Sequence, residues 1–579
     1  MEVSCVRADG VRADGAVQAD GAVRAGGAVR AADGRADPPV WPLALATAVV
    51  AVLIAVPALP EAPDWLGRCA RAVTGAGPLD PAPAAVLGLA LAFVARGVVL
   101  RRRAAWGVLV VLLGAALLAV LAGDGWAWRA PPLAAALGGL WLARDGFPVR
   151  PHPGRVRAAV WAAALPVAVA VSGSLLLGLP ARPDGPGAGG IGGIGTPVDG
   201  ASWVPDVLGL AGAAGLLVLV VLLTAPDPAP PPAGEADRRR VAALIAHPGS
   251  DTLAPFALRR DRAYAFSADG RAAIGYRVLF GVAVAGGDPV GDPASHADAA
   301  GAFLARCRAA GWRPAVLAAS DDLVPVWGLR HAIGYGDEVL VRPGEFSLAG
   351  RRMRNVRQAV QRTANAGVTT RITPERELDP ALRERLADIA SRSLGGAAER
   401  GFAMNLDELL TGRHPGTLIA VARDGGGEPV AFQRYVTAGG GVSLDAMRRL
   451  PGGPNGVNER LIVEMIGYAA RHGLGVVSLN FAAFRGLLAA EERNALERAG
   501  HRALHVFDRW IAAESLYLFD EKFRPSYKRR SVVFRSWLDA AWLAAAILTL
   551  EFGRPAPSAA PDPAALRPAP GPVPRRREP

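Results

Sequence analysis

Residues 429–481 read PVAFQRYVTAGGGVSLDAMRRLPGGPNGVNERLIVEMIGYAARHGLGVVSLNF, and this stretch decides the fold class. Short runs rich in β-branched and aromatic residues predict strands at Pro429–Thr437, Gly441–Ala446 and Val476–Phe481. Between the last two, apolar residues spaced three and four apart predict a helix over Asn458–His472. Strands that alternate with helices are typical of an α/β domain.

The same pattern extends from about residue 238 to residue 552. A segment of this size predicts two similar α/β lobes, at 238–395 and 396–552. The apolar stretch Trp537–Phe552 predicts an amphipathic helix that packs on the domain or lies on a bilayer surface, and the tail 553–579 is expected to be disordered. Further strands are predicted at Ala273–Ala285, Pro314–Ala319 and Thr417–Ala422, and further helices at Ala297–Ala310, Leu348–Ala366, Pro380–Leu394 and Glu491–Ala499.

The N-terminal part has a different composition. Residues 1–39 form a degenerate repeat with almost no large apolar side chains, which predicts a disordered tail. Any single apolar run after it could be a buried helix of a soluble protein, but six in succession predict a transmembrane domain of about six helices at 40–225, followed by a Pro-rich linker at 226–237. The six runs lie at 41–59, 84–100, 104–122, 131–143, 158–179 and 204–224.

The arginines of this part predict its orientation. They gather after the second run, at Arg101–Arg103, and after the fourth, between residues 144 and 157. The positive-inside rule then places the N-terminus and everything after residue 225 in the cytoplasm. We therefore expect a multi-pass protein of the bacterial inner (plasma) membrane with a cytoplasmic α/β part.

The net charge of +12 comes almost entirely from arginine, since Lys522 and Lys528 are the only lysines among 64 basic residues. Such charge suits anionic lipid headgroups or nucleic acid, and composition does not choose between them. Cys5, Cys69 and Cys307 are too widely separated for a disulfide framework or a zinc site. No metal site is expected.

The predicted helix at Leu348–Ala366 has an unusual charge pattern. It carries arginines and no acidic residue. A solvated face normally mixes charges of both signs, so a face of arginines indicates a polyanion such as tRNA or anionic lipid. The expected tRNA-binding residues are Arg351, Arg354, Arg357 and Arg362.

Three other stretches offer polar groups at predicted turns. Asp445 and Arg448 could bind an ammonium group and an anionic or carbonyl oxygen, or they could form a structural ion pair, and the residues alone favour neither. The Pro-Asn-Gly turn that follows opens a helix whose free N–H groups suit an anion, with Asn458 or Glu459 alongside. The GDPVGDP stretch, Gly287–Pro293, is either a rigid loop beside two carboxylates or a plain turn with Asp capping.

Both lysines fall in one short window of a chain that otherwise uses arginine. Lysine carries a compact ammonium whose pKa can shift, which arginine does not offer. We interpret this as a chemical requirement at Lys522.

Taken together, these windows resemble the lysyl-phosphatidylglycerol synthase part of the multiple peptide resistance factor family, most closely its actinobacterial form. The resemblance covers roughly 240–535, through GDPVGDP, FSLAGRRMRNVRQAVQRTANAGV, LDAMRR, PNGVNE, VSLNFAAF, FDRW, ESLY and KFRPSYKRR. It implies two GNAT-like lobes that transfer an aminoacyl group, lysyl in the first instance, from aminoacyl-tRNA to the glycerol hydroxyl of phosphatidylglycerol. The product would lower the negative charge of the membrane and favour resistance to cationic peptides. The departures are Tyr527 where the family usually has Trp, an absent synthetase domain and only about six spans.

The resemblance also implies the site. Asp445 and Arg448 match the family's Asp-x-x-Arg, and Lys522 matches its Lys-Phe-x-Pro lysine, so all three are expected to be catalytic. An aminoacyl ester is already activated, so no cofactor or metal is expected; the expected partners are aminoacyl-tRNA, phosphatidylglycerol and membrane lipids, with a homo-oligomer left open. The expected substrate-binding residues are Glu459, Asn458, Asn480, Glu514, Lys528 and Arg529.

Two alternatives stay open at this point. One is a GNAT-type acyltransferase that uses another donor, such as acyl-CoA, or an envelope acceptor. The other is a non-enzymatic lipid transporter or flippase whose cytoplasmic lobes only bind lipid or tRNA.

Overall fold

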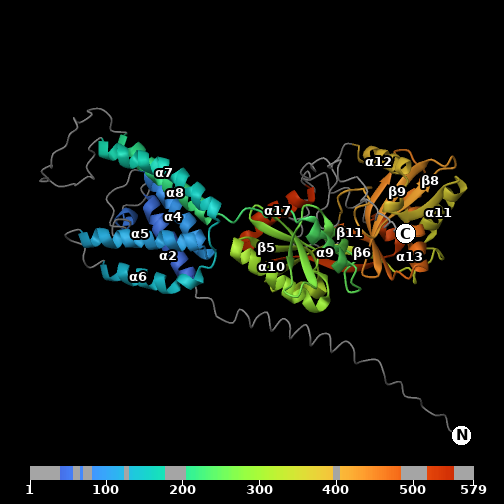
Figure 1. The fold of residues 1–579 in the computed structure, drawn as a ribbon, viewed down its shortest axis with the longest axis horizontal. Coiled ribbons are helices and arrows are strands. Elements are labelled where there is room, and N and C mark those ends of the chain that lie inside the picture. The colour runs from blue at the N-terminus through green and yellow to red at the C-terminus, as the bar shows by residue number, and fades with distance from the viewer. Residues whose placement is uncertain are drawn as a thin grey trace, which may run out of the picture. The chain divides into compact units, whose positions relative to one another are not determined.

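The computed structural model describes residues 40–56, 65–69, 81–122, 130–176, 204–395, 405–483 and 518–552. The predicted tails and the predicted helix Glu491–Ala499 lie outside these residues. The chain divides into two compact units. The helical unit comprises Met1–Pro231, Gly281–Ala283 and Ala300–Pro314, and the sheet unit comprises the rest (Figure 1).

All six predicted apolar runs form helices: α2 (Trp41–Ala55), α4 (Pro81–Val99), α5 (Arg103–Ala122), α6 (Ala130–Leu142), α7 (Pro153–Leu176) and α8 (Val204–Thr224). Small residues let α2 and α4 approach closely, because a Cβ built on Gly88 would lie 2.8 Å from the Ala55 Cβ. Between α5 and α6, the indole of Trp106 donates a hydrogen bond of 2.8 Å to the Leu140 carbonyl.

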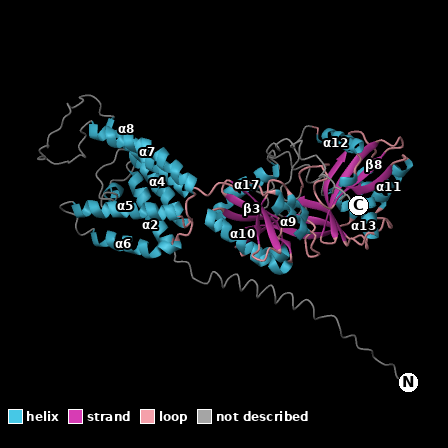
Figure 2. Cartoon of the chain, viewed as in Figure 1, coloured by secondary structure: helices cyan, strands magenta, loops and turns pink. Residues whose placement is uncertain are grey.

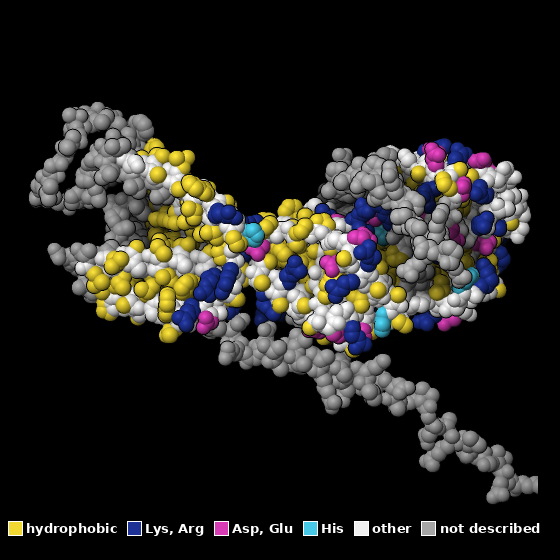
Figure 3. Space-filling view, viewed as in Figure 1, with side chains coloured by type: hydrophobic (Ala, Val, Ile, Leu, Met, Phe, Trp, Pro, Cys, Tyr) yellow, Lys and Arg dark blue, Asp and Glu magenta, His cyan; other side chains and the backbone are white. Residues whose placement is uncertain are grey.

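Length and hydropathy single out two of these helices as candidate membrane spans in the described residues. They are Pro81–Val99, with a mean hydropathy of 1.9, and Val207–Thr224, with 2.6. Trp41–Ala55 and Arg103–Leu118 are apolar but shorter. Hydrophobic side chains cover much of the helices' surface, and basic side chains gather at one end of them (Figure 3).

The sheet unit is built on one mixed sheet of 12 strands in the order β1-β2-β3-β5-β12-β6-β11-β10-β9-β8-β7, with β4 beside β2. Strands β10 and β11 run parallel, whereas β12 is antiparallel to both β5 and β6. The strands are β1 (Ala263–Phe266), β2 (Ala272–Leu279), β3 (Val282–Gly286), β4 (Val290–Gly291), β5 (Arg313–Ser320), β6 (His331–Val341), β7 (Thr369–Pro374), β8 (Thr417–Arg423), β9 (Pro429–Ala438), β10 (Gly441–Arg449), β11 (Val476–Ala483) and β12 (Ser526–Phe534). The helices are α9 (Glu235–Ile245), α10 (His296–Ala310), α11 (Arg354–Asn365), α12 (Pro380–Leu394), α13 (Val457–Arg471) and α17 (Ala540–Phe552).

Strand β12 joins the two halves of this sheet. It comes after β11 in the chain, yet it lies between β5 and β6: Ser526 is opposite Leu340 of β6, and Phe534 is opposite Ala315 of β5. A segment that the sequence assigns to the second lobe therefore pairs with strands of the first. Helices α11, α12 and α13 gather around the half that contains β8 (Figure 2).

Two predicted elements differ from the structure because of left-handed backbone. The strand predicted at Ala273–Ala285 is the hairpin β2–β3, because Phe280 (φ 50°) and Gly281 (φ 72°) form a two-residue turn. The helix predicted from Leu348 begins only at Arg354, since Gly350 has φ 85°. Helix α12 has the predicted bounds.

Helix α13 anchors the core beneath the second half of the sheet. Its buried face is a stripe at helical spacing, formed by Leu461, Ile462, Met465, Ile466 and Ala469. Gly456 precedes the helix with φ 97°, and a Cβ there would lie 2.9 Å from the Ala359 Cβ of α11. Glycine at this position thus lets the start of α13 pack directly on α11.

Gly456→Ala should destabilise the start of α13, because alanine would meet both the backbone strain and the contact with α11. We expect a cost of about 1–3 kcal/mol, measured as faster amide hydrogen exchange in α13. Gly344→Ala is the control, since Gly344 has nothing within 4 Å of its Cβ position. Unchanged protection of α13 in Gly456→Ala would contradict this account of the turn.

Candidate functional site

Lys522 and Glu459 form an ion pair at the start of α13. The Lys522 Nζ lies 2.9 Å from the Glu459 Oε1 and 4.9 Å from the ring centroid of Phe519. Glu459 stands in the first turn of α13, where the helix dipole favours a carboxylate. The Lys522 side chain remains 39% exposed. The structure therefore brings together two predicted site residues that are distant in sequence, and it leaves the ammonium group accessible.

Two predicted asparagines form hydrogen bonds to neighbouring strands. The carbonyl of Asn458 accepts a hydrogen bond of 3.2 Å from the Gln433 side chain of β9. Asn480, in left-handed conformation with φ 76°, donates its side-chain N–H to the Leu444 carbonyl at 2.8 Å. Asn480 thus links β11 to the residue before Asp445.

Asp445 is held in a buried ion pair with Arg434. The register of β9 and β10 shifts between Leu444 and Ala446, so Asp445 is the extra residue of a bulge. Its carboxylate accepts hydrogen bonds from the Arg434 side chain and from the Leu406 N–H, and both charged side chains are at most 1% exposed. This is the geometry of a structural ion pair, and its cation is Arg434. Arg448 donates to the Met447 carbonyl at 2.9 Å.

A second buried network surrounds Arg530 of β12. Its guanidinium donates to Asp288 at 2.8 Å, to Asp251 at 2.7 Å and to Glu338. The Lys528 ammonium donates to the other oxygen of Asp251 at 2.8 Å. Burial would lower the pKa of Arg530, but the surrounding carboxylates raise it on balance. The pKa of Asp288 is raised, because the cost of burying its charge exceeds the attraction of Arg530.

The Arg530 network includes residues that the sequence did not single out, among them Asp251, Glu338 and Arg530 itself. The sequence features that could have indicated this network were Asp288 in GDPVGDP and the basic run Lys528-Arg529-Arg530. Successive strand residues point to opposite faces. Arg529 is accordingly 66% exposed, with its nearest acidic oxygen 3.8 Å away on Asp321, whereas Arg530 is fully buried.

The arginine face of α11 lies on the surface as predicted. Val356, Ala359 and Thr363 are buried on the opposite face. Arg357 is partly engaged, since it donates to the Gly350 carbonyl at 3.1 Å and to that of Leu348. The remaining expected tRNA-binding residues, Arg351, Arg354 and Arg362, are exposed. Glu514 lies outside the described residues.

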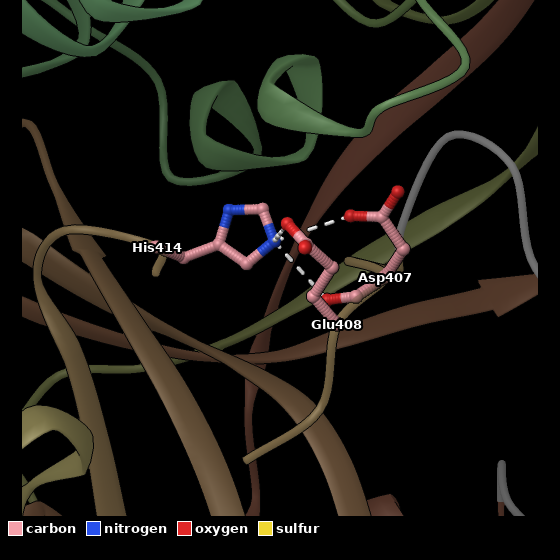
Figure 4. Close-up of side chains that lie close together, drawn as sticks. All are labelled: Asp407, Glu408 and His414. Carbon is pink, nitrogen blue, oxygen red and sulfur yellow. Dashed lines mark hydrogen bonds and ion pairs between the residues drawn. The ribbon is translucent and has the colours of Figure 1, made fainter. Parts of the chain in front are cut away.

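Asp407, Glu408 and His414 form the group of possible metal ligands in the described residues (Figure 4). The His414 Nε2 lies 3.1 Å from the Asp407 Oδ1 and 3.8 Å from the Glu408 Oε2. A divalent cation would have to compete with the three guanidinium groups that already pair with Glu408. They belong to Arg238, Arg260 and Arg413, at 3.3, 2.6 and 2.9 Å. The arrangement is therefore that of a charge-compensated structural cluster.

Asp520 is a further titratable group near Lys522 that the sequence did not indicate. It is buried, and burial raises its pKa to about 8, with a smaller contribution from Glu521. The carboxyl group therefore holds a proton at neutral pH.

The sequence of this sheet unit matches one known family. Residues 242–534, just over half of the chain, match the family described as "Phosphatidylglycerol lysyltransferase, C-terminal". The chain belongs to this lysyltransferase family. The match confirms the resemblance inferred from the sequence windows, and it covers the Lys522–Glu459 pair, the Arg530 network and α11.

The chain spans 67% of one curated relative and less than half the length of others. An MprF-like domain protein of Mycobacterium tuberculosis is 42% identical over 326 residues, which cover 55% of this chain and 67% of that protein. The lysylphosphatidylglycerol biosynthesis bifunctional protein LysX of Mycolicibacterium gilvum is 36% identical over 76% of this chain but only 43% of its own length. The solved structure of L-PGS from Bacillus licheniformis aligns with 56% of this chain and 99% of that chain at 19% identity, with a TM-score of 0.46.

Arg530→Met should destabilise the sheet unit by about 3–5 kcal/mol, because it leaves three buried carboxylates without their shared cation. Arg529→Met removes a neighbouring, exposed cation and should change stability by no more than about 0.5 kcal/mol. A urea titration followed by tryptophan fluorescence compares the two variants. Equal unfolding midpoints would show that the buried network does not support the sheet.

Asp520→Asn should stabilise the chain increasingly as pH rises. The folded state raises the pKa of Asp520 from 3.8 to about 8, so it binds more protons than the unfolded state between these values. Stability that depends on Asp520 is therefore lost as pH rises through this window. The melting temperature of Asp520→Asn minus that of the wild type should grow from pH 4 to pH 8, and a difference independent of pH would refute the assignment.

Proposed function

We propose that the chain transfers an aminoacyl group, lysyl in the first instance, from aminoacyl-tRNA to the glycerol hydroxyl of phosphatidylglycerol. The observation that carries the proposal is the accessible Lys522 ammonium, held by Glu459 at the start of α13 within the region that matches the lysyltransferase family. The printed names of the LysX relatives, which refer to lysylphosphatidylglycerol biosynthesis, agree with it.

The proposed reaction moves an acyl group between two oxygens. The lipid hydroxyl attacks the ester carbonyl of the aminoacyl donor, and a tetrahedral oxyanion forms. When the intermediate collapses, the bond to the ribose oxygen breaks, and the proton lost by the lipid hydroxyl ends on that ribose oxygen. The protein must therefore position the hydroxyl, neutralise the lipid phosphate and stabilise the oxyanion.

Within this proposal Lys522 supplies the positive charge at the phosphate or oxyanion. Glu459 orients the ammonium at 2.9 Å and offers its second oxygen to the amino group of the incoming aminoacyl moiety. Asp445 positions β10 through Arg434, and Arg448 lies three residues after Asp445, near the end of that strand. Arg448 is the second cation of the proposed site, as the family resemblance implies.

The other substrate-binding candidates have mainly supporting contacts. The backbone carbonyl of Asn458 accepts a hydrogen bond from Gln433 of β9, the Asn480 side chain donates to the Leu444 carbonyl of β10, and Lys528 pairs with Asp251. We propose that they shape the site rather than touch the reacting atoms. The donor is proposed to bind through the exposed arginines of α11. This helix carries no acidic residue that would offset their positive charge.

The membrane location is part of the same proposal. Helices α4 and α8 are long and apolar enough to span a bilayer, and we propose that they belong to a multi-span domain at 40–225 in the inner membrane. The distribution of arginine supports a cytoplasmic location for the sheet unit. Trp537, Trp542 and Leu548 at and before α17 are 59%, 48% and 45% exposed. Such side chains suit the headgroup region of a bilayer.

Lys522→Ala should lower kcat/KM for transfer by at least about 100-fold, because the charge at the oxyanion is lost. The assay follows radiolabelled lysine from lysyl-tRNA into vesicles that contain phosphatidylglycerol. Arg385→Ala is the matched control, since it removes an exposed cation on α12 that pairs with Glu428. Transfer at the wild-type rate by Lys522→Ala would reject the role of Lys522, and transfer insensitive to ribonuclease would point to a donor other than tRNA.

A further inference from the structure

A cavity of about 440 Å³ opens directly after Lys522 in the chain. It lies between the end of β6, the segment that leads into α11, and the residues that follow Lys522. One side of the cavity is lined by Phe523 and Arg524. The end of β6 contributes Arg342, and the segment before α11 contributes Phe346 and Met353. The cavity is therefore adjacent to the proposed catalytic lysine and to the arginine face of α11.

The lining is positively charged. Arg342 and Arg524 are both exposed, and Glu345 is the only acid among the described residues that line the cavity. Arg524 has left-handed backbone with φ 53°, a conformation that costs free energy for a residue with a side chain. Arg524 is the C-cap of the short helix Glu521–Phe523, and this turn lies between Lys522 and the start of β12.

The lining also has an aromatic wall. Phe346 is half-buried and packs against the core cluster that contains the buried Phe523. A partly exposed aromatic ring beside exposed guanidinium groups is the combination that binds unpaired nucleotides, through base stacking and phosphate contacts. The volume of the cavity is in the range of small-ligand sites.

We propose that this cavity receives the unpaired 3′-terminal nucleotides of an RNA donor, with phosphates on Arg342 and Arg524 and a base on Phe346. The inference rests on the proposed function and assigns its donor subsite. Met353 lines the cavity and directly precedes α11, so Arg351 and Arg354 stand next to it. They extend the basic surface outward for the paired part of the RNA.

A lipid headgroup fits the surroundings less well. The exposed apolar side chains suited to a bilayer lie beyond the other end of β12, where Trp537 contacts the ring of Phe534 at 5.2 Å. The cavity is lined by Ser526, at the first residue of that strand. The two ends of β12 are separated by about 26 Å at roughly 3.3 Å per residue.

The test measures binding of RNA to the full chain in detergent micelles. The probes are a labelled RNA minihelix with a short unpaired 3′ extension and the same minihelix with a blunt end. The wild type should bind the extended probe more tightly, and R342A/R524A should lose about tenfold in affinity for the extended probe alone. Its salt dependence should also weaken, with the slope of log K against log salt reduced by roughly 1.4 for two lost phosphate contacts.

Control variants separate the cavity from general charge effects. Arg330→Ala removes an exposed arginine just before β6, at the opposite end of the strand from Arg342, and should bind both probes as the wild type does. R351A/R354A should weaken binding of both probes alike. Phe346→Ser should weaken binding of the extended probe without changing the salt slope.

Equal binding of the extended probe by R342A/R524A and the wild type would overturn the proposal. So would a variant that binds RNA normally but needs more phosphatidylglycerol in the vesicle assay, because the cavity would then be a lipid headgroup site. The probes carry no amino acid, so this binding test does not depend on transfer. A wild-type chain that binds the 3′ extension but leaves lysine on its tRNA would refute the proposed function and not the RNA subsite.

Discussion

The buried guanidinium of Arg530 is the interaction on which the sheet unit depends. It bonds three carboxylates that come from different parts of the chain: Asp251 and Asp288 before β5, and Glu338 on β6. Because the arginine is on β12, the network ties the late strand to the segments on both of its sides. An uncompensated charge at this depth would be costly, so the register of β12 is strongly constrained.

That register also determines where the proposed functional groups lie. The residues before β12 hold Lys522 and Arg524, so the start of the strand brings them to the end of β6 and the segment before α11. The end of the strand leads to Trp537 and α17. A shift of β12 by one residue would turn Arg530 outward and bury Arg529, and it would displace Lys522 from Glu459.

The proposed site therefore relies on positioning and fixed charge. Glu459 is favoured by the helix terminus and holds Lys522 while the ammonium stays accessible. Asp445, which the sequence also offered as a substrate ligand, is occupied by Arg434 in the interior of the sheet. The contrast between an accessible pair and a fully buried pair separates a group that can meet a substrate from one that maintains the strand beside it.

Local pattern was enough to predict the helices α12 and α13, the six apolar helices, the arginine face of α11 and the family, because each depends on residues close together in the chain. Tertiary structure alone decided that β12 lies between β5 and β6, that Asp445 pairs with Arg434, and that Arg530 rather than its neighbour Arg529 is buried. These outcomes depend on partners far away in sequence. In the sequence, Lys528, Arg529 and Arg530 are three successive cations with nothing to distinguish them. In a paired strand, successive side chains point to opposite faces, and the carboxylates lie on only one of those faces.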